Sequence, residues 1–234
     1  TLTVGDSSST LFSGVISGSN ALAKAGGGTL TLSGANAYLG GTRVDAGTLA
    51  LAGGANRLPV GTTVAVASGA TLNLNGQSQT LYGIAGSGTV LGGSLLSVTG
   101  VVSPGGDGVV GGLSIAGSPA LAGKLLIDTR VNGACDSLSV DGNLDLSALA
   151  LQIADTAQMA GHAYVVATCS GSLTGSFVSN NLPKAWVLRY DRTPGAAAEP
   201  SWANDAMVGQ NARMSARAQA VGDFMYAPLE TGRI

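Results

Sequence analysis

Short runs of alternating apolar and polar residues recur along the chain, and each run follows a glycine. "GTLTL" occupies residues 28–32 and "GTLAL" occupies residues 47–51, and Thr-Leu or Thr-Val pairs return at Thr71 and Thr89. The intervals between these pairs are 19, 23 and 18 residues. Alternation with a period of two is typical of a half-buried β-strand. The pattern therefore predicts a series of equivalent short strands.

A fixed period near 20 residues indicates a coil of parallel strands in which one repeat makes one rung. Further apolar runs at 62–67, 95–102, 113–116 and 124–129 supply the remaining strands. Neighbouring rungs of such a coil lie about 4.8 Å apart, and every second side chain points into a narrow apolar interior. An antiparallel sandwich also uses many short strands. The regular period favours an all-β parallel β-helix over residues 1–130.

The composition changes near residue 131. Aromatic residues become concentrated after residue 160, and aspartates become more frequent, while strand-like runs continue with looser spacing. Because terminal repeats of solenoids are atypical, we interpret residues 131–192 as a C-terminal β cap that closes one end. Its predicted core residues are Leu138, Val140, Leu146, Tyr164, Phe177 and Trp186.

Beyond the predicted cap, "TPGAAAEP" at 193–200 reads as a linker. Met207, Asn211, Met214, Ala218, Val221 and Met225 then recur at helical spacing. This spacing predicts a short amphipathic helix within residues 203–226, although Gly209 and Gly222 weaken it by about 1 kcal/mol each. Residues 193–234 are thus expected to form a linker and a possible helix.

Charge and composition exclude several classes of protein. Charged residues make up 10% of the chain, the formal net charge is −2, and no Lys/Arg cluster occurs, so we expect no nucleic-acid partner. Polar residues interrupt every long apolar stretch, so no membrane-spanning run of about 20 residues appears.

The 37 glycines fit tight corners between short strands. The chain starts at Thr1 without a signal peptide and looks like part of something longer.

Catalytic and metal-binding patterns are weak throughout. His162 is the only histidine and precedes a strand-like run, which favours a turn position over a Ser-His-Asp triad. Asp141 and Asp145 flank "VDGNLDL" and are expected to be solvated rather than a glycosidase pair. "GGDGVVGG" at 105–112 lacks the second Asp of a calcium-binding repeat, and "GSGTVLGG" at 86–93 opens no helix that could hold phosphate. We therefore predict no catalytic residues, no cofactor and no metal.

Residues 22–51, "LAKAGGGTLTLSGANAYLGGTRVDAGTLAL", resemble the passenger-associated transport repeat of bacterial autotransporters. The resemblance rests on the pattern L-K-x-G-x-G-T-L-x-L-(S/T)-G-x-N-x-Y-x-G-x-T-x-(V/I)-x-x-G-T-L. The matching residues are Lys24, Gly26, Gly28, Thr29, Leu30, Leu32, Gly34, Asn36, Tyr38, Gly40 or Gly41, Thr42, Val44, Gly47, Thr48 and Leu49. Residues 134–182 are similar to the C-terminal passenger segment called the autochaperone, with matches at Asp136, Leu138, Val140, Gly142, Tyr164, Gly175 and Phe177.

This resemblance implies a right-handed parallel β-helix at or beyond the surface of a Gram-negative cell. It implies that the chain is exported through the periplasm and outer membrane with the help of its own C-terminal β-barrel translocator, which lies outside this sequence. An extracellular location favours disulfide bonds, so we expect Cys135 and Cys169 to form a disulfide. The alternative is that both are small buried hydrophobic residues.

Three functions remain open at this stage. The first is a structural stem and folding nucleus for a secreted passenger. The second is an adhesin or self-association module that binds a host surface or another copy of itself. The third is an enzyme whose catalytic residues lie outside this sequence, and nothing within it supports that reading.

Overall fold

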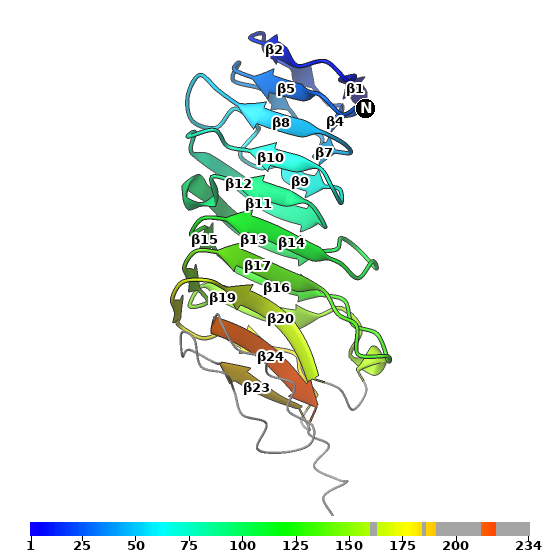
Figure 1. The fold of residues 1–234 in the computed structure, drawn as a ribbon, viewed down its shortest axis with the longest axis vertical. Coiled ribbons are helices and arrows are strands. Elements are labelled where there is room, and N and C mark those ends of the chain that lie inside the picture. Colours follow the sequence, from blue (N-terminus) through cyan, green and yellow to red (C-terminus); the bar gives the residue numbers. More distant parts are fainter. Residues whose placement is uncertain (160–162, 184–185, 191–211, 219–234) are drawn as a thin grey trace, which may run out of the picture.

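The computed structural model describes residues 1–159, 163–183, 186–190 and 212–218, and these residues form a long stack of short strands. The chain winds around one axis, and each turn adds a strand to each of two ten-stranded sheets (Figure 1). Two further pairs, β3–β6 and β18–β21, form short sheets of their own. The described chain is therefore an all-β parallel solenoid, as the glycine-led repeat predicts.

The first long sheet contains β1 (Leu2–Val4), β4 (Leu22–Lys24), β7 (Thr42–Val44), β9 (Thr63–Val66), β11 (Gln79–Gly86), β13 (Leu96–Pro104), β16 (Gly123–Ile127), β19 (Leu149–Ile153) and β22 (Ser179–Asn180), with β15 (Ala120–Leu121) beside β13. The second contains β2 (Thr10–Phe12), β5 (Thr29–Leu32), β8 (Thr48–Leu51), β10 (Thr71–Asn73), β12 (Thr89–Leu91), β14 (Gly112–Ala116), β17 (Ser137–Asp141), β20 (Ala163–Cys169), β24 (Ala212–Ala218) and β23 (Trp186–Tyr190). The short pairs are β3 (Ser17–Gly18) with β6 (Ala37–Tyr38) and β18 (Leu144–Asp145) with β21 (Leu173–Thr174). Two 3₁₀ turns, η1 (Gly93–Leu95) and η2 (Thr156–Gln158), complete the described elements.

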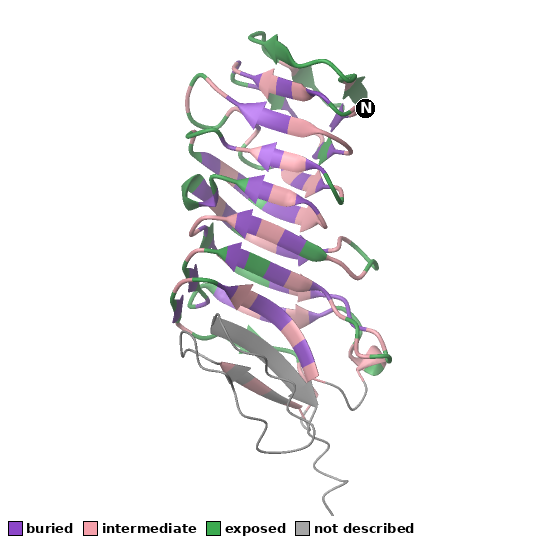
Figure 2. Ribbon diagram, in the orientation of Figure 1, coloured by how far each residue is buried: buried purple, intermediate pink, exposed green. Residues whose placement is uncertain are grey.

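One register runs through the second sheet and explains why the repeated sequence recurs. An inward ladder passes from rung to rung without interruption, and all its members are buried: Leu30, Leu49, Leu72, Val90, Ile115 and Val140. Figure 2 shows the resulting alternation of buried and more exposed bands along these strands. Each ladder member covers the one below it, so apolar area is removed from water along the whole axis.

An outward ladder of hydroxyl side chains runs alongside the buried one. The same register aligns hydroxyl residues on seven successive strands: Thr29, Thr48, Thr71, Thr89, Ser114, Ser139 and Thr168. Their side chains are half-buried or exposed. β-branched and hydroxyl residues suit such a partly covered pleated surface. The Thr of each Gly-Thr-Leu repeat therefore has a fixed place on the flank of the solenoid.

Parallel pairing continues past residue 130, where the sequence changes composition. β14 pairs with β17, β17 pairs with β20, and β16 pairs with β19, all in parallel. The first antiparallel pairs among the named strands join β24 to β20 and to β23. The segment from 131 to 180 thus adds further rungs to the same solenoid.

The amphipathic helix expected within residues 203–226 is contradicted over the part that the structure describes. Ala212–Ala218 forms strand β24, which lies between β20 and β23 and pairs with both. Its sequence, "ARMSARA", also alternates with a period of two, so it fits either structure. Two unpaired strand edges offer hydrogen bonds on both sides, and this tertiary context overrides a weak helical preference. The linker at 193–200 lies outside the described residues.

Helices that could cross a membrane are absent from the part of the chain that the structure describes.

Candidate functional site: the repeat of residues 22–51 and the ends of the solenoid

The repeat of residues 22–51 covers strands β4 to β8. The residues that match its pattern divide into two groups. Leu30, Leu32 and Leu49 are buried in the interior, whereas Thr29 and Thr48 belong to the outward hydroxyl ladder. Lys24 lies at the end of β4 and Asn36 between β5 and β6, and both bond to backbone groups at the corners between strands. Tyr38 and Thr42 bond to each other.

Lys24 is buried completely, and its ammonium lies inside the wall of the solenoid. Nζ donates hydrogen bonds to the carbonyl oxygens of Ala25 at 2.8 Å, Gly26 at 2.8 Å and Ala46 at 3.0 Å. Three carbonyls match the three donors of an ammonium group. Burial lowers the pKa of Lys24, and the nearby charge of Asp6 acts in the opposite direction. The lysine therefore ties the corner of its own turn to the corner of the next.

Asn36 connects three consecutive turns through one side chain. Its Oδ1 accepts a hydrogen bond from the N–H of Ile16 at 2.8 Å, and its Nδ2 donates to the carbonyl of Arg57 at 2.8 Å and to that of Gly34 at 3.2 Å. Ile16 lies one turn before Asn36 and Arg57 one turn after it. Only a side chain with both an acceptor and a donor can satisfy this corner.

Tyr38 and Thr42 form a buried polar pair at the next corner. The phenol oxygen of Tyr38 lies 2.5 Å from Oγ1 of Thr42, and both residues are almost fully covered. Burial raises the pKa of Tyr38 to about 12, while the hydrogen bond to Thr42 works against that rise. The phenol therefore stays protonated, and either hydroxyl group can supply the hydrogen of this bond.

Two glycines of the repeat are required by close backbone approach. A Cβ at Gly26 would overlap the backbone of Asp6, and φ at Gly26 is 69°. A Cβ at Gly28 would overlap the carbonyl group of Ser8 on the preceding turn. At Gly27, which the repeat pattern leaves variable, an added Cβ would meet open space. The two glycines of the K-x-G-x-G spacing therefore mark the positions where the backbones of successive turns come into contact.

The N-terminal end of the solenoid presents two strand edges and an apolar groove. β1 and β2 pair only with β4 and β5 among the described strands. Phe12 is 42% exposed, although its equivalents on the next two turns, Leu32 and Leu51, are buried, and Leu11 beside it is 68% exposed. A groove of about 270 Å³ lies between the two edges and is lined by residues that include Leu2, Val4, Leu11, Phe12 and Ile16. This end therefore exposes apolar side chains next to two free strand edges.

The opposite end is filled by larger side chains. Leu138, Val140, Leu146, Tyr164 and Phe177 are buried there, and Trp186 is partly buried against the same core. The rings of Tyr164 and Trp186 lie 5.5 Å apart, and those of Phe177 and Tyr190 lie 6.4 Å apart. Tilted ring pairs at these distances attract beyond the area that they bury. The predicted cap core residues thus come together in the last rungs.

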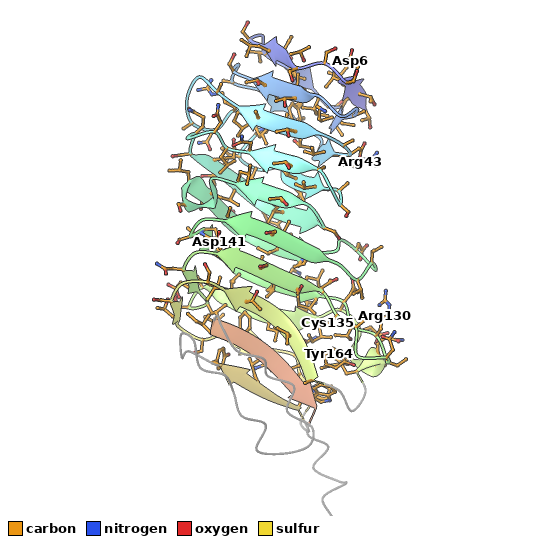
Figure 3. All side chains as sticks on the ribbon, viewed as in Figure 1. Asp6, Arg43, Arg130, Cys135, Asp141 and Tyr164 are labelled. Carbon is orange, nitrogen blue, oxygen red and sulfur yellow. The ribbon has the colours of Figure 1, made fainter. Side chains whose placement is uncertain are left out.

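The expected Cys135–Cys169 disulfide is absent, because both cysteines are free thiols. Strand register explains the error: Cys169 lies opposite Val140, five residues along the chain from Cys135. Five strand residues span about 16 Å, far beyond the reach of a disulfide. Figure 3 shows Cys135 and Asp141 toward opposite ends of β17. Sequence separation alone could not reveal this offset.

The remaining residues considered for chemistry are Asp141, Asp145 and His162. Asp141 and Asp145 are both exposed, and Oδ1 of Asp141 accepts a hydrogen bond from Ser170. Groups of three or more metal-binding side chains do not occur among the described residues. His162 lies outside them. Gln79, Asp128 and Asp136 are buried polar residues that the alternating pattern does not predict, because alternation identifies inward positions but not which turns need a hydrogen-bonding partner.

Comparison with known proteins agrees with this architecture. Residues 22–51 match the passenger-associated transport repeat, so the parallel solenoid carries the repeat of an exported passenger. The chain is part of an autotransporter passenger domain, a secreted cell-surface element of Gram-negative bacteria. A similar protein is the adhesin BmaC autotransporter of Brucella suis biovar 1 (strain 1330), 34% identical over 173 residues. That alignment takes in 66% of this chain and 5% of the adhesin, so the chain spans a small part of the relative's length.

Proposed function

We propose that this chain is a non-enzymatic stem and folding nucleus of its passenger. The supporting observation is the unbroken register from β5 to β20, in which each turn presents the next with a matching parallel edge. In a solenoid, structure spreads between neighbours from wherever local stability is greatest. A folded rung at one end therefore lowers the cost of ordering the next one.

The C-terminal rungs are the favoured starting point because their aromatic side chains bury the most area. Tyr164 and Phe177 are buried and paired with Trp186 and Tyr190, whereas the described rungs before residue 130 bury one aromatic side chain, that of Tyr38, among Leu, Val and Ala. From there, folding proceeds rung by rung toward β1 and β2 at the other end of the described stack. This role requires one partner, the C-terminal translocator of the same protein, from which the passenger emerges.

Matched substitutions at the two ends test the proposal. Leu146→Asp and Leu32→Asp each place a charge at a fully buried position, one in the C-terminal rungs and one near the N-terminal edge. We expect Leu146→Asp to abolish folding of the whole chain, measured by circular dichroism and refolding rate. Leu32→Asp is expected to leave residues 131–180 protected in hydrogen exchange.

Hydrogen exchange on the unmodified chain provides the direct comparison. We expect amides in residues 131–180 to exchange more slowly than those in residues 28–102. Faster exchange in residues 131–180, or loss of the entire fold in Leu32→Asp alone, would show that the nucleus lies elsewhere.

An adhesive role is the second candidate, and two observations favour it. The outward ladder from Thr29 to Thr168 offers regularly spaced hydroxyl groups along one flank, and the similar Brucella protein is named an adhesin. Such a surface suits a host surface or a second copy of the chain. Replacement of Thr48, Thr71 and Thr89 by Val should then reduce self-association in sedimentation velocity or binding to host cells. Unchanged association and binding would remove the support that the ladder provides.

A further inference from the structure

Two connections leave the solenoid on the same flank and meet at the carboxyl group of Asp136. Residues 105–111 connect β13 to β14, and residues 128–136 connect β16 to β17. Asp136 is the last residue of the second connection, and it is fully buried. Its Oδ1 accepts a hydrogen bond from the N–H of Gly111 at 2.8 Å, and its Oδ2 accepts one from the N–H of Asp128 at 2.8 Å. One side chain therefore holds the ends of both connections.

A second set of contacts joins the outer parts of the same connections. Asp128 Oδ2 accepts a hydrogen bond from the N–H of Gly108 at 2.9 Å, and Arg130 Nη2 donates to the Gly108 carbonyl at 2.6 Å. The hydroxyl of Tyr164 on β20 donates to the carbonyl of Arg130 at 2.9 Å. Figure 3 shows Arg130, Cys135 and Tyr164 together on this flank. The arrangement thus spans three successive turns.

The buried carboxyl group of Asp136 forms no ion pair within 4 Å among the described side chains. The charges of Asp128 and Arg130 act on it, and the thiol of Cys135 is its neighbour in the chain. Asp107 belongs to the first connection, and Tyr164 bonds to the carbonyl of Arg130. Burial raises the pKa of Asp136 to about 6. The N–H groups of Asp128 and Gly111 oppose this rise, the charge of Asp128 adds to it, and the charge of Arg130 opposes it.

We propose that Asp136 and the two connections that it joins, residues 105–111 and 128–136, form a latch that acid tightens and that neutral pH loosens. When the latch opens, the carboxyl group reaches water and regains the ordinary pKa of a solvated aspartate, near 3.8. The closed form therefore holds its proton more strongly than the open form. Closure is favoured fully below that ordinary value and is progressively lost as pH rises through about 6.

The expected size of the effect follows from the two pKa values. With an open-form pKa near 3.8 and a closed-form pKa of about 6, the opening equilibrium changes by about 50-fold between pH 4 and pH 7. Opening affects the two connections and leaves the stacked leucine and valine ladders in place. A chain displayed outside the cell would thus present a firmer flank in acidic surroundings than in neutral ones.

Hydrogen exchange of individual amides tests the latch, because the N–H of Gly111 bonds directly to Asp136. After correction for intrinsic exchange, the protection of this amide should fall by about 50-fold from pH 4 to pH 7. The amide of Leu49, deep in the ladder, serves as a reference and should stay unchanged. In Asp136→Asn the pH dependence at Gly111 should disappear. A wild-type profile that is flat, or that rises with pH, would overturn the proposal.

A second measurement avoids any variant that fails to fold. Titration of the Asp136 carboxyl carbon by NMR should give a midpoint near 6 in the intact chain, and Asp128→Asn should lower that midpoint by removing a neighbouring negative charge. A midpoint near 3.8, or one that does not respond to Asp128→Asn, would contradict the latch.

Discussion

The ammonium nitrogen of Lys24 lies 3.0 Å from the carbonyl oxygen of Ala46, which belongs to the next turn of the solenoid. A buried charge is costly unless its hydrogen bonds are satisfied, and here three backbone carbonyls satisfy it. The repeat therefore contains a lysine whose role is internal. Its contribution to stability should be visible in single substitutions.

Lys24→Met should lower the free energy of unfolding by about 3 kcal/mol, because it leaves three carbonyl oxygens without their donor. Urea denaturation followed by circular dichroism measures the change. Lys124→Met is the control, since Lys124 is exposed on β16 and its loss should cost less than about 0.5 kcal/mol. Equal effects of the two substitutions would contradict a structural role for the buried ammonium.

Asn36→Ala should destabilise the chain by about 2–3 kcal/mol, because it removes bonds to Ile16 and Arg57 on the two neighbouring turns. Asn132→Ala removes only a local bond to Ala134 within one exposed turn and serves as the comparison. Thermal unfolding of both variants provides the measurement. The prediction fails if Asn132→Ala costs as much as Asn36→Ala.

Gly28→Ala and Gly27→Ala should differ sharply although the two positions are adjacent. The new methyl group at Gly28 overlaps the carbonyl group of Ser8, and such overpacking costs about 1–3 kcal/mol or more. At Gly27 the methyl group meets open space, so the loss of chain freedom in the unfolded state should leave stability unchanged or raise it by up to about 1 kcal/mol. Chemical denaturation distinguishes the two results, and similar midpoints would refute the steric account.

Tyr38 should make the chain sensitive to alkali. Its pKa is about 12 in the folded chain and near 10 when exposed, so the folded state holds this proton more tightly. The contribution to stability is complete below pH 10 and is lost as pH rises toward 12. Tyr38→Phe should therefore flatten this part of the stability curve, measured as urea midpoints between pH 9 and pH 12. A slope unchanged by Tyr38→Phe would assign the alkaline sensitivity to other groups.

Both thiols should be free in the native chain, and Cys135 should react slowly. Burial and the neighbouring Asp136 raise the pKa of Cys135 to about 11, despite the opposing hydrogen bond to the Val165 carbonyl. Alkylation at pH 8 should therefore be about 100-fold slower than in the unfolded chain, because the thiolate is the reactive species. Mass spectrometry under non-reducing conditions should show no loss of two hydrogens. Such a loss would show that the two cysteines form a disulfide.

The repeat and the inward positions were predictable because a period of two and a period near 20 residues both appear directly in the sequence. Leu30, Leu49 and Leu72 occupy the predicted interior for this reason. The position of Cys135 relative to Cys169 was not predictable, because loop lengths between strands decide the register and leave no local signal. The helix expected around Met214 failed for a related reason, since two open strand edges lie far away in sequence.

The purely parallel stacking before β24 has a mechanical consequence. Each turn is held mainly by the turns directly above and below it, so tension along the axis should detach one turn at a time. A turn of about 20 residues would release roughly 7 nm of chain when it is pulled straight. A stem of this kind should unfold in small steps of similar length, so a sudden load is absorbed by the unfolding of successive turns.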